Sequence, residues 1–178
     1  MPKVIENIRK TILTTAKNTL LADGYEGLSL RGVSKQCNIA VGTIYNYFPS
    51  KLALIAAIML EDWTKQLAKM QENCAGAENV ETGIKSIFYS LREFSVLYQS
   101  VWSMSMHSKE VRDEMLNGRS RHQMLMEQVA GVIRVLLERF KISYDPFLPH
   151  FIATSLLAYI MEPDFEYAQI NKVLKKII

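Results

Sequence analysis

Apolar residues recur every three or four positions along most of the chain, which is the spacing of one face of an α-helix. The first such segment spans about Val4 to Ala22, with Gly24 expected to end it. Its apolar stripe is formed by Ile5, Ile8, Ile12, Ala16 and Leu20. Strand-like alternation is absent, and the five prolines and eight glycines fall mostly at segment boundaries. The sequence therefore predicts an all-α protein.

Two short helices joined by a tight turn are predicted next. Ser29 is a suitable N-cap for the segment LRGVSKQC, and Asn38 tolerates the left-handed backbone that a turn requires. A third helix begins near Ala40, and its Ile44 and Phe48 lie four residues apart, on one face. Helices of this length, separated by such a turn, are typical of a helix-turn-helix.

The third helix, GTIYNYF, carries polar and aromatic groups around that apolar pair. Small residues at its tip would let the backbone approach a DNA major groove. Tyrosine hydroxyls and Lys51 can bind phosphates, whereas Thr43 and Asn46 suit base edges. Pro49 ends this helix and Ser50 caps the next one. The alternative interpretation makes Tyr45 and Tyr47 half-buried scaffold residues.

The order of a first helix, GY, LSLRGVSKQ and GTIYNYFPSK, followed by an apolar-rich helix, resembles the N-terminal DNA-binding domain of TetR-type transcriptional regulators over about Ile8 to Ile58. Ala40 stands where that family usually has a serine or threonine cap, and Asn38 where glycine is frequent. The resemblance implies a dimeric, repressor-like regulator that binds double-stranded DNA at a palindromic operator. It also implies a larger helical domain that senses a small molecule.

The same resemblance implies roles for individual residues in DNA binding. Base contacts are expected from Arg31 and Thr43, and phosphate contacts from Ser29, Tyr45, Tyr47 and Lys51. The tip that faces the groove is expected to consist of Val41, Gly42 and Asn46.

A long helix from Ser50 to about Met70 is predicted to join a DNA-binding domain, residues 1–50, to a regulatory domain for ligand binding and dimerisation, residues 51–178. A loop, NCAGAEN, is expected to follow this helix. A ligand that moves the C-terminal end of this long helix would shift the DNA-reading helix, provided that the ligand favours one of two orientations of the long helix.

The regulatory domain is predicted to contain helices over VETGIKSIFYSLREFSVLY and QSVWSMSMH, and a further helix from Ser108 through Gly118 to about Phe140. Aromatic and methionine side chains are frequent here, and such adaptable groups could line a pocket for an apolar or aromatic effector. The alternative is that they are core residues. The candidate ligand-binding residues are Trp63, Phe88, Tyr89, Tyr98, Trp102, Met106 and Met124.

The C-terminal stretch predicts a helix that starts at Asp145, with Pro146 just inside, and a second helix from about Asp164 to Ile178 after a turn at Pro163. Large apolar residues are too numerous for a helix covered on one side, so an exposed face is expected to meet its copy in a homodimer. The candidate interface residues are Phe151, Ile152, Leu156, Tyr159 and Ile160.

Charge and composition limit the kinds of function that the protein can have. The net charge is +3, yet the first 60 residues hold seven Lys/Arg against three acidic residues, which suits a polyanion partner. No apolar run approaches the roughly 18–20 residues of a membrane span, and no signal-peptide core is present, so no membrane partner and a cytoplasmic location are expected. The two cysteines and three histidines lack metal-ligand spacing, and no cofactor is expected.

Catalytic motifs are missing as well. The lone glycines of GAEN and TGIK follow no strand, and no nucleophile with its base is evident, so an enzyme is not expected. Two functional hypotheses remain: an effector-gated TetR-like repressor, or a TetR-fold co-regulator that acts through protein interactions without ligand-gated repression.

Overall fold

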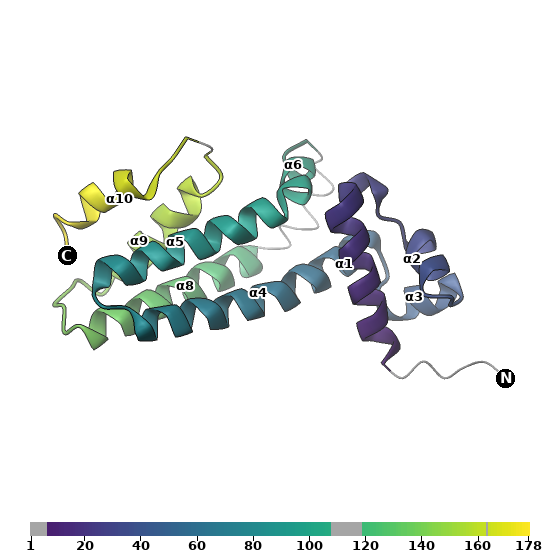
Figure 1. The fold of residues 1–178 in the computed structure, drawn as a ribbon, viewed down its shortest axis with the longest axis horizontal. Helices are drawn as coiled ribbons and strands as arrows, with labels where there is room; N and C mark the ends of the chain where they lie inside the picture. Colours follow the sequence, from purple (N-terminus) through teal and green to yellow (C-terminus); the bar gives the residue numbers. More distant parts are fainter. Residues whose placement is uncertain (1–6, 108–118, 163) are drawn as a thin grey trace. The chain divides into compact units, whose positions relative to one another are not determined.

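The computed structural model of the protein describes residues 7–107, 119–162 and 164–178, with side chains for residues 7–104, 123–162 and 164–178. Every regular element in these ranges is an α-helix, which confirms the predicted all-α class (Figure 1). The helices are α1 (Ile8–Gly27), α2 (Leu30–Gln36), α3 (Val41–Tyr47), α4 (Lys51–Gly76), α5 (Val80–Leu97), α6 (Gln99–His107), α8 (Arg119–Arg139), α9 (Leu148–Tyr159) and α10 (Tyr167–Leu174).

The helices form two compact units. The first unit contains α1 to α3, the start of α4 through Asp62, and the stretch from Tyr98 that includes α6. The second unit contains the rest of α4 from Trp63, together with α5, α8, α9 and α10. The division into functional domains at residue 50 stays a prediction.

Helix α1 bends near its end. It buries Ile12, Ala16 and Leu20, as the apolar stripe predicts, and its hydrogen bonding continues to Gly27. Gly24 interrupts it with φ 71° and ψ −172°, a combination that is essentially restricted to glycine. The predicted stop at Gly24 is therefore a kink, and the helical turn beyond it carries Tyr25.

Helix α4 is longer than predicted. It continues beyond Met70 to Gly76, so the first residues of the expected loop NCAGAEN are helical. Met70 and Cys74 lie four residues apart, and both are buried in the second unit. The apolar spacing thus carries the helix one and a half turns further than the predicted end.

The C-terminal helices start later than predicted. The Asp145 carboxylate accepts a hydrogen bond from the Phe147 amide at 2.8 Å, which holds a turn in front of α9. The proline in the first turn of α9 is Pro149, so the placement of Pro146 inside the helix was wrong. Helix α10 covers only the middle of the predicted final segment. The predicted helical stretch 108–118 and the turn at Pro163 lie outside the described residues.

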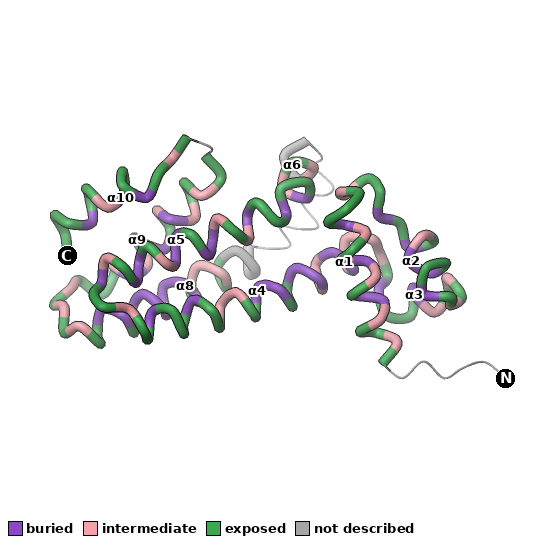
Figure 2. Tube along the Cα trace, viewed as in Figure 1, coloured by how far each residue is buried: buried purple, intermediate pink, exposed green. Residues whose placement is uncertain are grey.

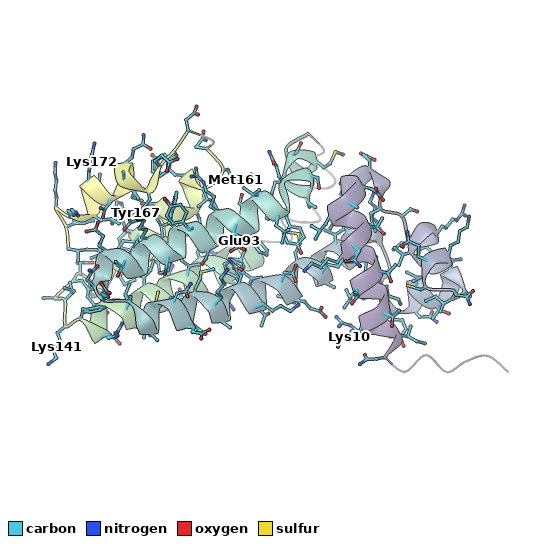
Figure 3. All side chains as sticks on the ribbon, in the orientation of Figure 1. Lys10, Glu93, Lys141, Met161, Tyr167 and Lys172 are labelled. Carbon is cyan, nitrogen blue, oxygen red and sulfur yellow. The ribbon has the colours of Figure 1, made fainter. Side chains whose placement is uncertain are left out.

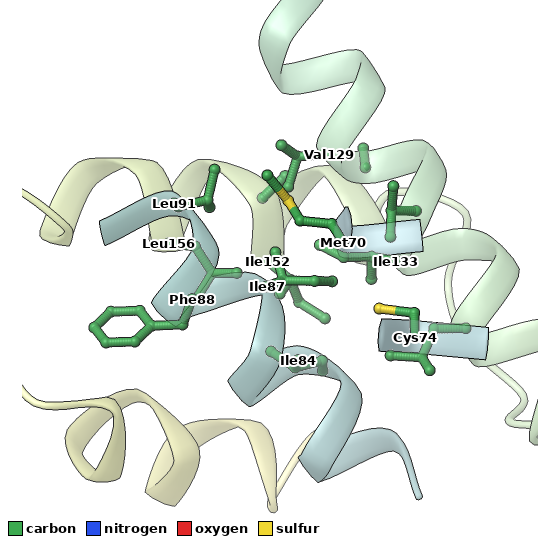
Figure 4. Close-up of a cluster of buried hydrophobic side chains, with 14 of the residues drawn as sticks. Met70, Cys74, Ile84, Ile87, Phe88, Leu91, Val129, Ile133, Ile152 and Leu156 are labelled. Carbon is green, nitrogen blue, oxygen red and sulfur yellow. The ribbon is translucent and has the colours of Figure 1, made fainter. Parts of the chain in front are cut away.

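The core of the second unit is apolar and aromatic. Figure 4 shows Met70, Ile87, Val129 and Ile152 meeting from four helices, and all four are fully buried. A polar link also joins two helices beside this core, since the Tyr167 hydroxyl of α10 donates to the Glu81 carbonyl of α5 at 3.0 Å (Figure 3).

The first unit contains a buried polar cluster. Asp62 is 8% exposed, and its Oδ2 atom lies 2.6 Å from the Lys17 ammonium and accepts a hydrogen bond of 2.6 Å from the Tyr98 hydroxyl. Burial, followed by the hydrogen bond to this carboxylate, raises the pKa of Tyr98 far above its ordinary value. The Asp62 carboxylate thereby joins α1, α4 and the residue that precedes α6.

Length and hydropathy bear on whether a helix in the described ranges could span a membrane. No one of them is by itself both long and apolar enough to cross a bilayer. Helices α3 and α4 together have the length and apolar composition of a membrane span, but the chain bends by 58° between them.

Candidate nucleic-acid interface

Local capping explains the geometry of α2. The Ser29 hydroxyl oxygen accepts the Gly32 amide at 3.0 Å, as expected for an N-cap. At the other end Asn38 adopts a left-handed φ of 53°, and the Ile39 amide donates back to the Ser34 carbonyl at 3.0 Å. These two features produce the predicted tight turn between α2 and α3.

Helix α3 is held by one apolar edge. Ile44 is fully buried and Phe48 is 4% exposed, so the predicted inward pair is confirmed. Ala40 precedes the helix and supplies no side-chain cap, and the Thr43 amide donates to the Ala40 carbonyl at 2.9 Å. Ile44 is the only buried residue within α3 itself (Figure 2). The packing therefore leaves most of this helix available to a partner.

The outward face of α3 carries the two tyrosines. Tyr45 is 51% exposed and Tyr47 is 45% exposed, and Asn46 between them is exposed as well. Both rings are about half exposed, which fits DNA contact and the half-buried scaffold alternative alike. Thr43 and Val41 are half-buried at the tip of the helix.

Gly42 is exposed, and a Cβ atom added to it would meet no atom of the protein within 4 Å. Internal packing therefore gives no reason for a glycine at this position.

Basic and hydroxyl groups flank this face. Arg31 and Ser29 are exposed on α2, and the Ser29 hydroxyl keeps its proton available for donation because its oxygen is the acceptor in the cap. Ser50 caps α4 by accepting the Ala53 amide at 3.0 Å, as predicted. Lys51 follows it, and its ammonium lies 3.9 Å from the centroid of the Tyr25 ring.

The environment of Lys51 changes its acidity. Burial lowers the pKa of its ammonium, and the nearby Glu26 carboxylate opposes this effect. The side chain is half-buried. Lys51 is therefore a cation held against the protein surface, whereas Arg31 extends from an exposed position.

The candidate ligand-binding residues are distributed over both compact units. In the second unit Phe88 is fully buried and Trp63 is 3% exposed, and the indole Nε1 of Trp63 donates to the Gln128 Oε1 at 2.7 Å. Tyr89 and Met124 are exposed, and they border two separate shallow surfaces, on α5 and beside α8. Their ligand-binding role stays a prediction.

Tyr98 and Trp102 belong to the first unit, where Tyr98 is fully buried against Asp62 and Trp102 is half-buried. The side chain of Met106 lies outside the described residues. Trp63, Phe88 and Tyr98 are thus buried side chains of the protein.

The candidate dimer-interface residues in and just after α9 differ in how far they are exposed to solvent. Ile152 and Leu156 are fully buried in the core of the second unit of their own protomer. They are therefore not part of an exposed face. Phe151 and Tyr159 are 43% and 47% exposed, and Ile160 is half-buried. An interface on α9 would therefore use Phe151 and Tyr159.

Histidine and cysteine side chains in the described part of the chain have ordinary structural surroundings. Cys37 and Cys74 are buried free thiols, and burial raises the pKa of Cys74. His150 lies 3.4 Å from the Glu127 carboxylate on the surface. No cluster of three or more metal-ligating side chains occurs among the described residues.

Sequence reasoning missed two polar contacts beside the candidate interface: the cluster around Asp62 and the pairing of Tyr25 with Lys51. A signal for the first was present, because Asp62 stands four residues after Ile58 and so continues the buried stripe of α4 with an acidic residue. The second joins residues that are distant in sequence, and no local pattern indicates it.

Comparisons with known proteins agree with this geometry. The model of the bacterial regulatory proteins of the tetR family matches residues 12–58. The HTH-type transcriptional regulator UidR of Escherichia coli strain K12 is 30% identical over 140 residues, which cover 77% of this chain and 70% of UidR. The HTH-type transcriptional repressor KstR of Mycobacterium tuberculosis strain H37Rv is 36% identical over 70 residues, covering 39% of this chain and 32% of KstR.

Solved structures share the fold. Salmonella enterica GusR has a TM-score of 0.61 at 20% identity, with 86% of this chain and 82% of that chain covered. The transcriptional regulator FadR from Bacillus subtilis, in complex with stearoyl-CoA, has a TM-score of 0.57 at 15% identity, with 94% and 96% covered. An exposed helix-turn-helix face, the match of the family model to it and the similarity to UidR lead to one conclusion: the chain belongs to the TetR family of DNA-binding transcriptional regulators, which are not enzymes.

Proposed function

We propose that the protein is a repressor that binds a palindromic operator as a homodimer and releases or holds DNA in response to a small apolar or aromatic effector. The observation that carries this proposal is the division of α3 into a buried edge, Ile44 and Phe48, and an outward face with Tyr45 and Tyr47. Such a face can enter a major groove without loss of the helix packing. The related KstR proteins are named repressors.

The proposed DNA contacts follow from chemistry and exposure. Thr43 and Arg31 would contact base edges, while Ser29, Tyr45, Tyr47 and Lys51 would contact phosphates. Val41, Gly42 and Asn46 would form the tip in the groove. Residues 1–50 would act as the DNA-binding domain and residues 51–178 as the regulatory domain.

Homodimerisation is proposed through the exposed aromatic residues of α9. Phe151 and Tyr159 are large, exposed and apolar, and the Tyr159 ring stacks on Phe165 with 4.4 Å between centroids. A two-fold pairing of this surface is the usual form of a symmetric interface. Two α3 helices set about 34–36 Å apart would then read two half-sites on one side of the duplex.

Fewer structural observations support effector control than support DNA binding. The similar FadR fold was solved with stearoyl-CoA, so a small-molecule site is compatible with this architecture. The tight burial of Trp63 and Phe88 favours the second candidate function, a TetR-fold co-regulator without ligand gating. A screen of small apolar and aromatic metabolites, scored by loss of operator binding, separates the two: hits support gating, and a protein partner captured with no hits supports the co-regulator.

Alanine variants of the proposed interface test the DNA-binding roles. Tyr47→Ala and Lys51→Ala should weaken binding to all duplexes alike, whereas Thr43→Ala should relax discrimination at one base step by about 1–3 kcal/mol. Fluorescence anisotropy on operator and unrelated duplexes, over a series of salt concentrations, measures both effects. Loss of the Lys51–phosphate contact should reduce the salt slope by about 0.9 per contact, whereas loss of the uncharged Tyr47 hydroxyl should leave the slope unchanged.

The matched control is Lys172→Ala, which removes the same charge from an exposed position on α10 (Figure 3). It should leave the salt slope unchanged. A Lys51→Ala variant whose slope equals that of the Lys172→Ala variant would remove Lys51 from the proposed phosphate contacts.

A further inference from the structure

A cation and an aromatic ring meet beside the proposed DNA-binding face. The Lys51 ammonium lies 3.9 Å from the centroid of the Tyr25 ring, within the distance at which a ring face attracts a cation. Both residues belong to the first compact unit, and both are half-buried. Tyr25 is not among the residues proposed above to contact DNA.

The backbone explains how this ring comes to face Lys51. Gly24 breaks α1 with φ 71° and ψ −172°, and Tyr25 follows directly in the last helical turn. On the other side, the Ser50 cap fixes the first turn of α4, where Lys51 is the first residue. Two independent local devices, a glycine kink and a serine cap, therefore set the positions from which the two side chains meet.

The contact leaves the ammonium able to bind a further group. A lysine ammonium has three N–H donors, and a ring face attracts the charge without accepting all of them. Partial burial lowers the pKa of Lys51, and the Glu26 carboxylate opposes that shift, so the side chain is already partly withdrawn from water. A lysine held in this way loses less rotamer freedom when a phosphate binds it.

We propose that Tyr25 is a positioning residue for DNA binding: its ring face holds the Lys51 ammonium in place for a phosphate of duplex DNA, without a DNA contact of its own. This inference rests on the proposed DNA-binding function of the α2–α3 face. It adds a residue from α1 to the determinants of affinity.

The test is a double-mutant cycle on the full-length chain with a random-sequence duplex as the probe. Dissociation constants are measured by fluorescence anisotropy for the wild type, Tyr25→Leu, Tyr25→Phe, Tyr25→Trp, Lys51→Gln and the Tyr25 variants combined with Lys51→Gln. Tyr25→Leu should weaken binding about two- to tenfold per protomer, because the lysine released from the ring must then lose its rotamer freedom when the phosphate binds. Tyr25→Phe should bind within about twofold of the wild type, because the ring remains.

Two readouts distinguish positioning from a general structural effect. In the Lys51→Gln background the Tyr25→Leu substitution should have no further effect, because there is no ammonium to position. The salt slope should stay at the wild-type value in Tyr25→Leu, since the charge is still present, and should fall in Lys51→Gln. If Tyr25→Leu does not fold, Tyr25→Trp carries the test: it should bind at least as tightly as the wild type, and any gain should vanish with Lys51→Gln.

Several outcomes would overturn the inference. Equal weakening by Tyr25→Leu in both backgrounds would show a role independent of Lys51. Equal weakening by Tyr25→Phe and Tyr25→Leu would assign the effect to the hydroxyl. Either result leaves the proposed function intact, whereas a wild-type chain that fails to bind duplex DNA at low salt would overturn the proposed function and this inference together.

Discussion

Replacing Phe88 by alanine should lower the free energy of unfolding by about 3–5 kcal/mol, the range for deletion of a large aromatic side chain from a packed core. Phe88 is fully buried, and its ring lies 5.7 Å from the ring of Tyr167 and 6.2 Å from that of Phe165. The Arg92 guanidinium lies 5.1 Å from the same ring. The substitution therefore removes a contact shared by α5, α10 and the segment before α10, and urea denaturation followed by circular dichroism measures the loss.

The matched control is the neighbouring residue Tyr89, which is 45% exposed. Tyr89→Ala removes an aromatic ring of similar size but should cost about 1–2 kcal/mol, because nearly half of the Tyr89 side chain is already exposed while its ring packs edge-on against Phe88 with 5.3 Å between centroids. A similarly small cost for Phe88→Ala would mean that water already reaches the ring, as expected for the wall of an open effector pocket. That result would contradict the core assignment of Phe88.

A second large decrease in the free energy of unfolding is expected for Asp62→Ala. Removing the carboxylate leaves the buried Tyr98 hydroxyl without the acceptor that it has at 2.6 Å, and it separates the Lys17 ammonium from its counter-charge at 2.6 Å. Breaking a buried ion pair by deleting one partner costs about 3–5 kcal/mol. The lower end is expected here, since the Lys17 side chain is 32% exposed and can regain hydration.

Glu61 supplies the control, because it is the adjacent acidic residue and forms an exposed ion pair with Arg9 at 3.3 Å. Glu61→Ala should change the unfolding free energy by about 1 kcal/mol or less. Urea denaturation of both variants provides the comparison. Equal costs for the two substitutions would show that the Asp62 cluster contributes no more than a surface ion pair.

Local features of the fold were predictable from the sequence because their causes lie within a few residues. Ser29 and Ser50 cap helices by accepting amides three residues ahead, and Asn38 forms a turn through its own backbone. The spacing of Ile44 and Phe48 predicted which edge of α3 is buried, and hence which residues point outward. The exposure of Tyr45, Asn46 and Tyr47 follows from this local periodicity, whereas the roles of Ser29 and Arg31 were implied by the family resemblance.

Features that depend on distant partners were not predictable in the same way. The sequence pattern of Phe88 suits a core residue or a pocket wall, and its burial against the rings of Phe165 and Tyr167, which are remote in sequence, could not be predicted from local spacing. Ile152 looked available for a dimer because its coverage comes from helices that are remote in sequence. The role proposed for Tyr25 depends on the Lys51 ammonium over its ring, and these two residues are distant in sequence.

Sequencing the random duplexes that the full-length protein retains is the most direct measurement of the central claim, that α3 presents its outward face to DNA twice per dimer. Two copies of this helix predict enrichment of an inverted repeat whose half-site centres lie about 10 base pairs, or a multiple of that spacing, apart. Thr43→Ala should retain the symmetry and lose the preference at one step of each half-site. A pool that remains random, or an enriched element without two-fold symmetry, would contradict the claim.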